Sequence, residues 1–216
     1  MDSIKRQTQR LIERRTANRE CITVSGFDLE IARGVYQTGL DTSLFIDSIE
    51  MSASKDFLEI GCGCGAIAIA LSSRARKGVA CDINMGAVRN TQRNLKHLGI
   101  LNVRALYSDV FSKISGDFDV VIFNCPYTKH PVLDPVDRMF WDPEDEAKKK
   151  FFLQAQEHLR PDGILYFGWA DFEYLDIDFP STLASRAGFH LVETFARPVP
   201  TNAFSYYVLK YKRSSS

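Results

Sequence analysis

The sequence lacks both a long apolar run and an excess of charge of one sign. It has no run of about 18 apolar residues, the length that a membrane-spanning helix needs. Lys and Arg together number 27, as do Asp and Glu, so the whole chain lacks the basic character of a nucleic-acid-binding protein, although a local basic patch is not excluded. The first residues, MDSIKRQTQRLIERR, contain no apolar signal core. We therefore expect a cytoplasmic protein without a membrane segment, and nucleic acid is disfavoured as its partner.

The cysteines show no pattern typical of a metal site or of a disulfide framework. They are five in number and stand at positions 21, 62, 64, 81 and 125. Cys62 and Cys64 are separated by one glycine, but no Cys-x-x-Cys pair and no pair of histidines accompanies them. We expect small buried thiols in a reducing compartment and no metal ion.

Apolar segments of strand length alternate with longer helical segments along most of the chain. With 216 residues, of which 45% are hydrophobic, the chain can form one domain over residues 1–216. We expect strands at 57–60, 78–82, 103–106, 118–123 and 164–167, helices at 44–49, 66–71, 84–98, 144–158 and near 180–187, and a terminal antiparallel pair at 190–195 and 206–211. This order predicts an α/β fold with a mostly parallel sheet of about seven strands, ending in an antiparallel hairpin. The segment 118–123 is the most hydrophobic of the strands, so we place it at the centre.

The first 33 residues form a helix and a hairpin outside this alternation. The helix is expected over residues 3–20, with Ile4, Leu11 and Ile12 near one face and basic residues over the rest. Apolar alternation on both sides of a Ser-Gly pair predicts a β-hairpin at 22–31. Residues 1–33 can be a solvated face with a thin apolar stripe, a lid over an active site, or a weak contact surface for RNA or an acidic protein.

A strand, a glycine-rich turn and a helix follow one another at residues 56–71. Glu59 precedes Gly61, Gly63 and Gly65 at alternate positions. Glycines let the backbone turn sharply and approach a ligand, and the helix N-terminus that follows offers free N–H groups. The spacing differs from the dinucleotide fingerprint G-x-G-x-x-G. It resembles motif I of the class I S-adenosylmethionine (SAM) methyltransferases, which implies that Glu59 and the glycine backbone hold the methionine end of SAM.

Acidic residues end or follow the next two expected strands. Asp82, followed by Ile83, ends the strand after the glycine turn, and Asp109, followed by Val110, comes after the next strand. In open α/β sheets ligands bind beyond the carboxyl ends of the strands. A carboxylate at Asp82 can accept hydrogen bonds from both ribose hydroxyls, and Asp109 would lie near the adenine. With Glu59 and the glycines, this order is similar to that of class I methyltransferases over residues 56–125, which implies SAM as the cofactor and a Rossmann-like fold.

The residues Asn124, Cys125, Pro126 and Tyr127 directly follow the strand expected at the centre. They resemble the N-P-P-Y signature of methyltransferases that act on planar nitrogens, among them the glutamine N5, adenine N6 and guanine N2 enzymes. Hydrogen bonds to the Asn124 side-chain carbonyl and to the backbone carbonyl of Cys125 would orient such a nitrogen. Pro126 holds residue 125 extended, and Tyr127 can stack on a planar group or face the methylsulfonium. Cys125 stands where the signature has proline.

The stretch from Val35 to Thr42 carries a second resemblance to the glutamine-methylating branch. It is similar to the segment V-Y-x-P-x-x-D-T but lacks its proline. The resemblance implies that Asp41, Thr42 and also Asn124 contribute to cofactor binding, and that Tyr36 contributes to substrate binding. Thr42 or Ser43 can also cap the helix that follows.

Aromatic residues after the last two parallel strands are candidates for a substrate wall. The long loop Thr128–Pro143 carries Phe140 and Trp141, and Trp169, Phe172 and Tyr174 follow the fifth strand. Hydrophobic packing is the other interpretation of each. His130 can be a base or a solvated loop residue, and Cys125 has no evident base that would make it a nucleophile.

The sequence therefore predicts a SAM-dependent N-methyltransferase that acts on an amide, an amine or another planar nitrogen of a small molecule or a protein. Two alternatives stay open. In the first, SAM itself is the substrate, and its α-amine attacks its own γ-carbon and releases methylthioadenosine. In the second, the chain is a non-catalytic SAM-binding or methyltransferase-like partner subunit.

Overall fold

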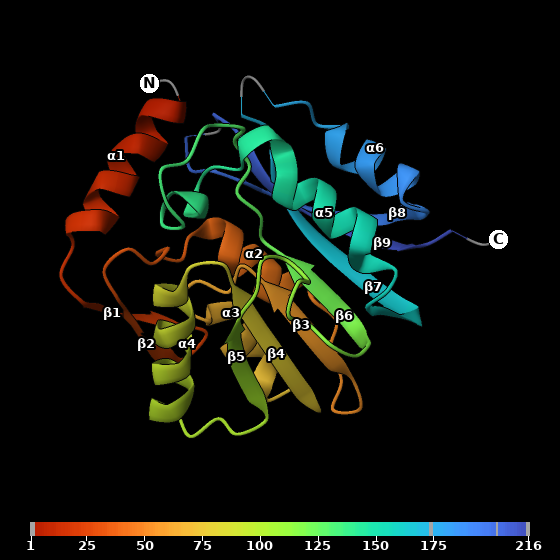
Figure 1. Ribbon diagram of the computed structural model, residues 1–216, viewed down its shortest axis with the longest axis horizontal. Coiled ribbons are helices and arrows are strands. Elements are labelled where there is room, and N and C mark those ends of the chain that lie inside the picture. Colours follow the sequence, from red (N-terminus) through yellow and green to blue (C-terminus); the bar gives the residue numbers. More distant parts are fainter. Residues whose placement is uncertain (1–2, 173–174, 202, 215–216) are drawn as a thin grey trace.

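A seven-stranded sheet forms the centre of the molecule (Figure 1). The computed structural model describes residues 3–172, 175–201 and 203–214. The strand order is β5-β4-β3-β6-β7-β9-β8. The strands are β3 (Asp56–Ile60), β4 (Lys77–Asp82), β5 (Val103–Tyr107), β6 (Phe118–Phe123), β7 (Leu159–Ala170), β8 (Phe189–Pro198) and β9 (Ser205–Arg213). The first five are parallel and β9 runs antiparallel to both of its neighbours, so the predicted sheet and the central place of β6 are confirmed.

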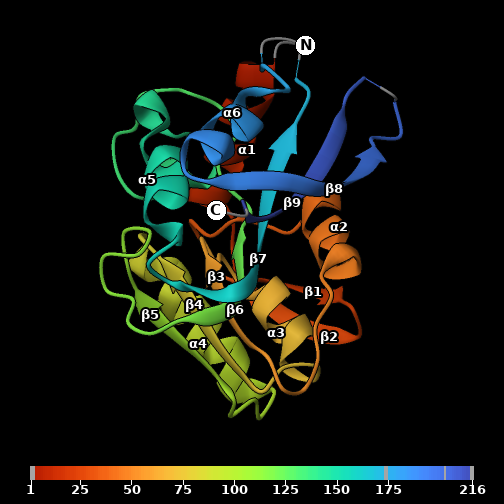
Figure 2. The same cartoon turned by 90° about the vertical axis from the view of Figure 1, so that its right-hand side faces the viewer.

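Helices cover both faces of this sheet. They are α2 (Leu40–Ser48), α3 (Ala66–Ser72), α4 (Met85–His97), α5 (Glu146–Ala155) and α6 (Phe179–Arg186). Side chains on β6 alternate: Val120 and Ile122 pack in the core beneath α2, α3 and α4, whereas Val121 and Phe123 pack in the core beneath α5 and α6. Figure 2 shows α2 and α3 on the opposite side of β6 and β7 from α5. Because both faces of β6 are covered, its side chains from Val120 to Phe123 are apolar and buried, which explains the hydrophobic run.

The N-terminal elements lie beside the sheet and do not join it. The helix α1 (Ser3–Thr16) is followed by β1 (Glu20–Val24) and β2 (Phe27–Ile31), which form a separate two-stranded sheet. The helix and the hairpin were predicted, but the buried face of the helix was not. The buried residues of α1 are Ser3, Gln7, Leu11 and Arg14, whereas Ile12 is 52% exposed. The prediction of an apolar stripe including Ile12 was therefore wrong, because polar contacts hold this helix.

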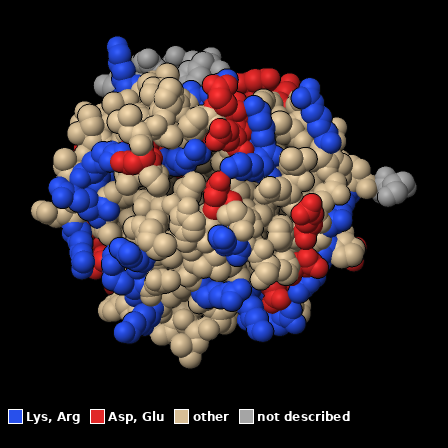
Figure 3. Space-filling view, viewed as in Figure 1, with Lys and Arg blue, Asp and Glu red and all other residues tan. Residues whose placement is uncertain are grey.

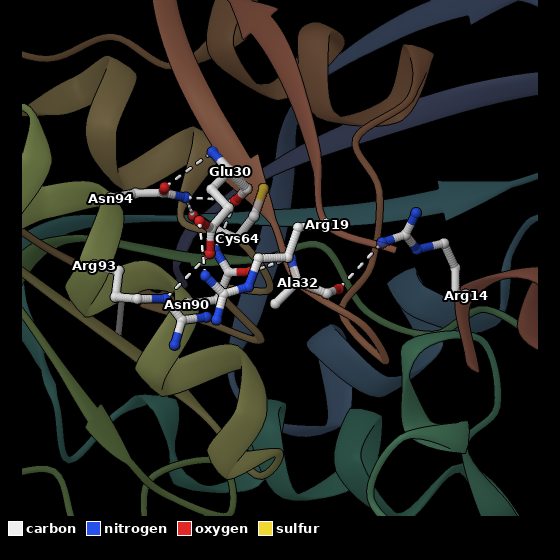
Figure 4. A network of polar contacts seen from close by, with 8 residues as sticks. All are labelled: Arg14, Arg19, Glu30, Ala32, Cys64, Asn90, Arg93 and Asn94. Carbon is white, nitrogen blue, oxygen red and sulfur yellow. Dashed lines mark hydrogen bonds and ion pairs between the residues drawn. The ribbon is translucent and has the colours of Figure 1, made fainter. Parts of the chain in front are cut away.

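Two buried asparagines on α4 attach the hairpin to the rest of the fold (Figure 4). Asn94 Nδ2 donates to the backbone oxygens of Glu30 and Cys64, each at 2.9 Å, and Asn94 Oδ1 accepts from the Glu30 N–H at 3.0 Å. Asn90 pairs with the same strand through the Ala32 N–H and the Glu30 oxygen. Cys64 belongs to the glycine-rich turn, so one side chain ties β2, α4 and that turn together.

The bounds of several elements differ from the prediction. The first helix, predicted over residues 3–20, ends at Thr16, and Glu20 already belongs to β1. The helix α2 begins at Leu40 with Gly39 as its N-cap, and Thr42 Oγ1 accepts from the Gly39 N–H, so neither Thr42 nor Ser43 is the cap. A 3₁₀ turn at Pro143–Asp145 precedes a shorter α5. The strand β7 begins at Leu159, five residues before the predicted strand at 164–167, so residues 160–163 belong to it.

The strand β8 ends the sheet on the side of β9. Its register with β9 shifts between Leu191 and Glu193, and most of its side chains are exposed. No helix within the described residues has the length and apolar character needed to cross a membrane.

The role of Asn94 can be tested by Asn94→Asp. The carboxylate has no N–H to donate to the two backbone oxygens, so the free energy of unfolding should fall by about 1–3 kcal/mol. Urea unfolding measures this change, with Asn18→Asp at an exposed position as the matched control. Equal stability of the two variants would show that the asparagine contacts contribute little.

Candidate active site

A cavity of about 220 Å³ opens at the carboxyl ends of β3, β4 and β6. Most of the residues predicted to bind the cofactor line this cavity. They are Gly61, Gly63, Asp82, Ile83, Asp109, Val110, Asp41 and Asn124. Of the residues predicted to act in catalysis or to bind the substrate, those that line the cavity are Cys125, Pro126, Tyr127, Tyr36 and Phe140. Segments far apart in the sequence therefore meet at one site, at the place where the order of parallel strands reverses on either side of β3.

The turn after β3 requires its glycines for the backbone conformation. Gly61, Gly63 and Gly65 have φ values of +71°, +55° and +87°, which residues with a Cβ rarely adopt. Gly65 does not line the cavity: it is the N-cap of α3, and a Cβ there would lie 2.7 Å from Thr91 Cγ2. The first two glycines thus bring backbone to the cavity, and the third allows α3 to pack closely on α4.

Glu59 lies behind this turn and not in the cavity. It is 3% exposed, and its Oε2 accepts from the backbone N–H of Ala68 in the first turn of α3 at 2.9 Å. Burial, with a smaller effect from the nearby Asp82, raises the pKa of Glu59 well above its usual value. The side chain therefore positions the helix that follows the glycine turn, and any effect of Glu59 on the cofactor passes through that helix.

Asp82 is hydrogen-bonded to the glycine turn. Its Oδ2 accepts from the Gly63 N–H at 3.0 Å and its Oδ1 from the Asn84 N–H at 2.8 Å. Burial raises the pKa of Asp82, and the backbone N–H groups oppose that shift. Each carboxylate oxygen keeps a lone pair, so the geometry fits a pair of ribose hydroxyls.

The third acid differs in its surroundings. Asp109 lines the cavity, and its Oδ2 pairs with Lys150 Nζ of α5 at 2.7 Å. Val110 has a φ of +50°, and its backbone oxygen accepts from the Ser108 hydroxyl at 2.8 Å. Ser108 also lines the cavity and was not predicted as a site residue. These residues could hold the base end of a nucleoside.

Asn124 is fixed by two side chains on opposite sides of its amide. Its Nδ2 donates to Asp41 Oδ2 at 2.9 Å, and its Oδ1 accepts from the Tyr127 hydroxyl at 2.8 Å. The Tyr36 hydroxyl also donates to Asp41, at 3.0 Å to Oδ2. Burial, followed by the Asp41 charge, raises the pKa values of Tyr36 and Tyr127, so both phenols stay protonated as donors.

Cys125 has no features of a nucleophile. It is 4% exposed, and its thiol donates to the backbone oxygen of Gly168 at 3.3 Å. Burial raises the pKa of this thiol, which opposes formation of the reactive thiolate.

Several predicted site residues do not line the cavity. Thr42 and Trp141 are buried beside it, the latter in a small cluster with Leu11 and Phe140. Trp169 packs edge-on against Tyr127 with ring centroids 6.2 Å apart, and so supports the wall from behind. His130 lies over Trp141 and outside the cavity. Phe172 lines the cavity, and Tyr174 lies outside the described residues.

The helix α1 supplies cavity residues that were not predicted individually. Ser3, Arg6, Gln7 and Arg10 line the cavity from above the strand ends, and Phe204 and Tyr206 line it from the start of β9. The available signal was the spacing of Ser3, Gln7 and Arg10 along one helical face. Within the described residues no group of His, Cys, Asp and Glu could hold a metal ion.

The strand order, the glycine turn after β3, the acid at the end of β4 and the Asn-Cys-Pro-Tyr turn after β6 define a class I SAM methyltransferase architecture. Residues 32–177 match the model of the methyltransferase small domain, and the chain belongs to that family. Membership of this family supports the predicted methyltransferase class and, with it, SAM as the predicted cofactor.

Individual relatives differ in the acceptors that their names state. The chain is 38% identical over 107 residues to a Methanocaldococcus jannaschii protein provisionally named a protein N5-glutamine methyltransferase, covering 49% of this chain and 54% of that one. It is 29% identical over 175 residues to the Klebsiella pneumoniae ribosomal RNA small subunit methyltransferase C, covering 79% and 47%. The chain thus spans about half the length of these curated relatives.

A solved structure shares the fold. The T. thermophilus 16S rRNA N2 G1207 methyltransferase, in complex with SAM and guanosine, superposes with a TM-score of 0.66 at 17% identity, covering 91% of this chain and 50% of that one.

The place of Asp82 predicts its effect on SAM binding. Asp82→Ala removes a charged acceptor of hydrogen bonds, so the dissociation constant of SAM should rise by about 10- to 100-fold. Calorimetric titration measures it, with Asp117→Ala at an exposed position of the loop before β6 as the control. An unchanged SAM affinity in Asp82→Ala would remove the carboxylate from the cofactor site.

The buried Glu59 predicts a pH dependence of stability. Its folded-state pKa is raised above the ordinary 4.5, so its stabilising contribution is fully present below that pH and is lost as the pH rises through the folded-state pKa. Glu59→Gln keeps an acceptor for the Ala68 N–H and abolishes the titration. The stability of the variant relative to the natural protein should therefore increase as the pH rises above about 4.5 in urea unfolding. The exposed Glu157→Gln serves as control, and parallel pH curves for Glu59→Gln and the natural protein would contradict this account.

Proposed function

We propose that this methyltransferase transfers the methyl group to a planar nitrogen, either a carboxamide or an exocyclic amine. The observation that carries the proposal is the orientation of Asn124 at the end of β6. Asp41 can only accept hydrogen bonds when it is charged, so the amide nitrogen of Asn124 must face it. The Asn124 oxygen consequently points the other way, where it accepts from Tyr127 and keeps a second lone pair.

That lone pair suits an acceptor with an N–H group. The lone pair of a planar nitrogen is delocalised, and hydrogen bonds from its N–H groups to fixed acceptors favour the charge that develops on nitrogen. SAM, when bound, supplies an electrophilic methyl group, and displacement leaves S-adenosylhomocysteine. Asn124 Oδ1 would hold one N–H, so that the nitrogen is aligned with the methyl group, and the proton is then lost to water.

The neighbourhood of Asn124 is suited to a planar group and to a cation. The Tyr127 ring lies 6.2 Å from Trp169 and 6.1 Å from Tyr206 between ring centroids, and it is 8% exposed. Aromatic faces attract cations such as a sulfonium and stack on planar groups. The backbone here is also close: a Cβ at position 168 would lie 2.9 Å from Asn124 Oδ1, so Gly168 leaves the space that this oxygen occupies.

Two relatives support the choice of nitrogen. Their names state glutamine N5 and a ribosomal RNA, and the solved structure names guanine N2; both nitrogens are planar and conjugated. The two acceptors share a chemical class although one is a protein and the other a nucleic acid. The proposal therefore concerns the class of nitrogen and not a particular acceptor molecule.

Substitution of Asn124 separates catalysis from cofactor binding. Asn124→Ala should lower kcat by about 100-fold or more while the dissociation constant of SAM changes by only a few fold, because the lost hydrogen bond acts on the nucleophile. Tyr127→Phe keeps the ring and removes one donor to Asn124, so its loss should be smaller. The exposed Asn18→Ala is the control.

Product analysis decides the reaction. Methyl transfer yields S-adenosylhomocysteine only when an acceptor is added. Many turnovers to methylthioadenosine with SAM alone would contradict the proposal and favour attack by the α-amine of SAM itself. Parallel losses of turnover and SAM affinity in Asn124→Ala would make this residue a cofactor ligand.

A further inference from the structure

The helix α1 brings two arginines into the cavity beside the acceptor side of Asn124. Arg6 and Arg10 lie one helical turn apart and both line the cavity. The helix is held in place by its last turn: Arg14 Nε donates to the Val35 oxygen at 3.0 Å, and Arg15 pairs with the buried Asp137 at 2.6 Å. The two guanidinium groups are therefore presented by an anchored element.

Both guanidinium groups lie over aromatic rings. The Arg6 guanidinium carbon is 5.3 Å from the centroid of Phe204, and that of Arg10 is 5.7 Å from Tyr36 and 5.2 Å from Phe140. A guanidinium stacked by its face keeps its N–H groups at its edge, in the arrangement that binds a carboxylate or phosphate with two hydrogen bonds.

Neither arginine has an acidic ion-pair partner among the described residues. A third cavity arginine, Arg138, shows the contrast, since it lies 3.8 Å from Asp142 and 3.6 Å from Glu146. Arg10 hydrogen-bonds Tyr36, and the Asp41 carboxylate is a further, weaker electrostatic neighbour of Arg10. Arg6 is therefore the less compensated of the two arginines.

Gln7 provides an independent sign of a missing ligand. It lines the cavity between the two arginines, is 7% exposed, and its Oε1 is buried without a hydrogen-bond partner within the described chain. A buried acceptor without a partner destabilises the folded protein, so such atoms are commonly satisfied by a ligand or by water. A ligand bound here would donate a hydrogen bond to Gln7 Oε1 and would place an anionic group beside Arg6 and Arg10.

Arg6 lies on a different side of β6 from the residues that are expected to bind the cofactor. The glycine turn, Asp82 and Asp109 follow β3, β4 and β5, on one side of β6. Arg6 packs on Phe204, which precedes β9 and contacts Tyr206 at 5.2 Å between ring centroids. Tyr206 in turn contacts Tyr127, the residue of the Asn-Cys-Pro-Tyr turn that faces the other half of the sheet.

We propose that the acceptor carries an anionic group, a carboxylate or a phosphate, which Arg6 and Arg10 bind while Asn124 holds the nitrogen to be methylated. This inference rests on the proposed function and names the chemical class of its substrate. The surface charge agrees with it: Figure 3 shows Lys and Arg gathered on the left, over α1 and α4, where they would attract an anion. The neutral net charge of the chain therefore conceals a local positive region.

Binding of matched pairs to the protein saturated with S-adenosylhomocysteine tests the proposal without turnover. One pair is N-acetylglutamine and its C-terminal amide; the other is guanosine 5′-monophosphate and guanosine. In at least one pair the anionic member should bind about tenfold more tightly in calorimetry at low salt, as expected for charged hydrogen bonds. The pair that shows the preference identifies the source of the anion, a carboxylate or a phosphate.

Variants assign the preference to α1. Arg6→Gln should reduce it to within about twofold and Arg10→Gln should reduce it less, whereas Lys5→Gln, the same change of charge at an exposed position of the helix, should leave it intact. The SAM affinity should stay unchanged in Arg6→Gln.

Three results would overturn the proposal. They are no charge preference in either pair, a preference that survives both arginine substitutions, and an equal loss of SAM affinity in Arg6→Gln, which would assign the arginine to the cofactor carboxylate. Failure of the proposed function differs from all three, since it would appear as absence of an N-methylated product and not as a change in anion binding.

Discussion

The hydrogen bond between Asn124 and Asp41 is the contact on which the arrangement of this site depends. It joins the turn after β6 to the first turn of α2, across 83 positions of sequence. Asp41 is 4% exposed, and a buried carboxylate is tolerated only where donors surround it. The donors are the Asn124 amide and the Tyr36 hydroxyl, so the orientation of the Asn124 amide follows from the need to satisfy a buried acid.

The residues next to Asp41 and Asn124 also depend on one another for hydrogen-bond partners and packing. Tyr36 supports Asp41 from one side and lies under the Arg10 guanidinium on the other. Tyr127 completes the amide of Asn124 and joins an aromatic group with Tyr206 and Trp169. The polar groups around Asn124 thus form one hydrogen-bonded network, in which the loss of one side chain leaves another without a partner.

The sequence predicted the parts of the fold that depend on local pattern. The buried β6 could be recognised from its apolar run, and the glycine turn from residues that need a positive φ. The role of Glu59 could not be read in the same way, because an acid before the glycines suits a ligand and a helix N–H equally well, and only the fold shows it bonded to Ala68. The face of α1 was missed because Gln7 and Arg14 are buried by distant backbone and cavity atoms, and periodicity of apolar residues carries no trace of such contacts. Thr42 was predicted as a helix cap because threonine is a common N-cap residue. The helix begins earlier, at Leu40, and Gly39 is its N-cap.

The register shift in β8 has a consequence for the molecule in crowded solution. An edge strand of ten residues presents backbone groups to which another chain could pair, and Leu191 and Val192 beside the shift are 44% and 45% exposed. The shift interrupts the regular spacing of those groups at the most apolar point of the edge. Pro198, which has no N–H, ends the strand. The long antiparallel addition to the sheet is therefore protected against edge-to-edge aggregation by its own irregularity.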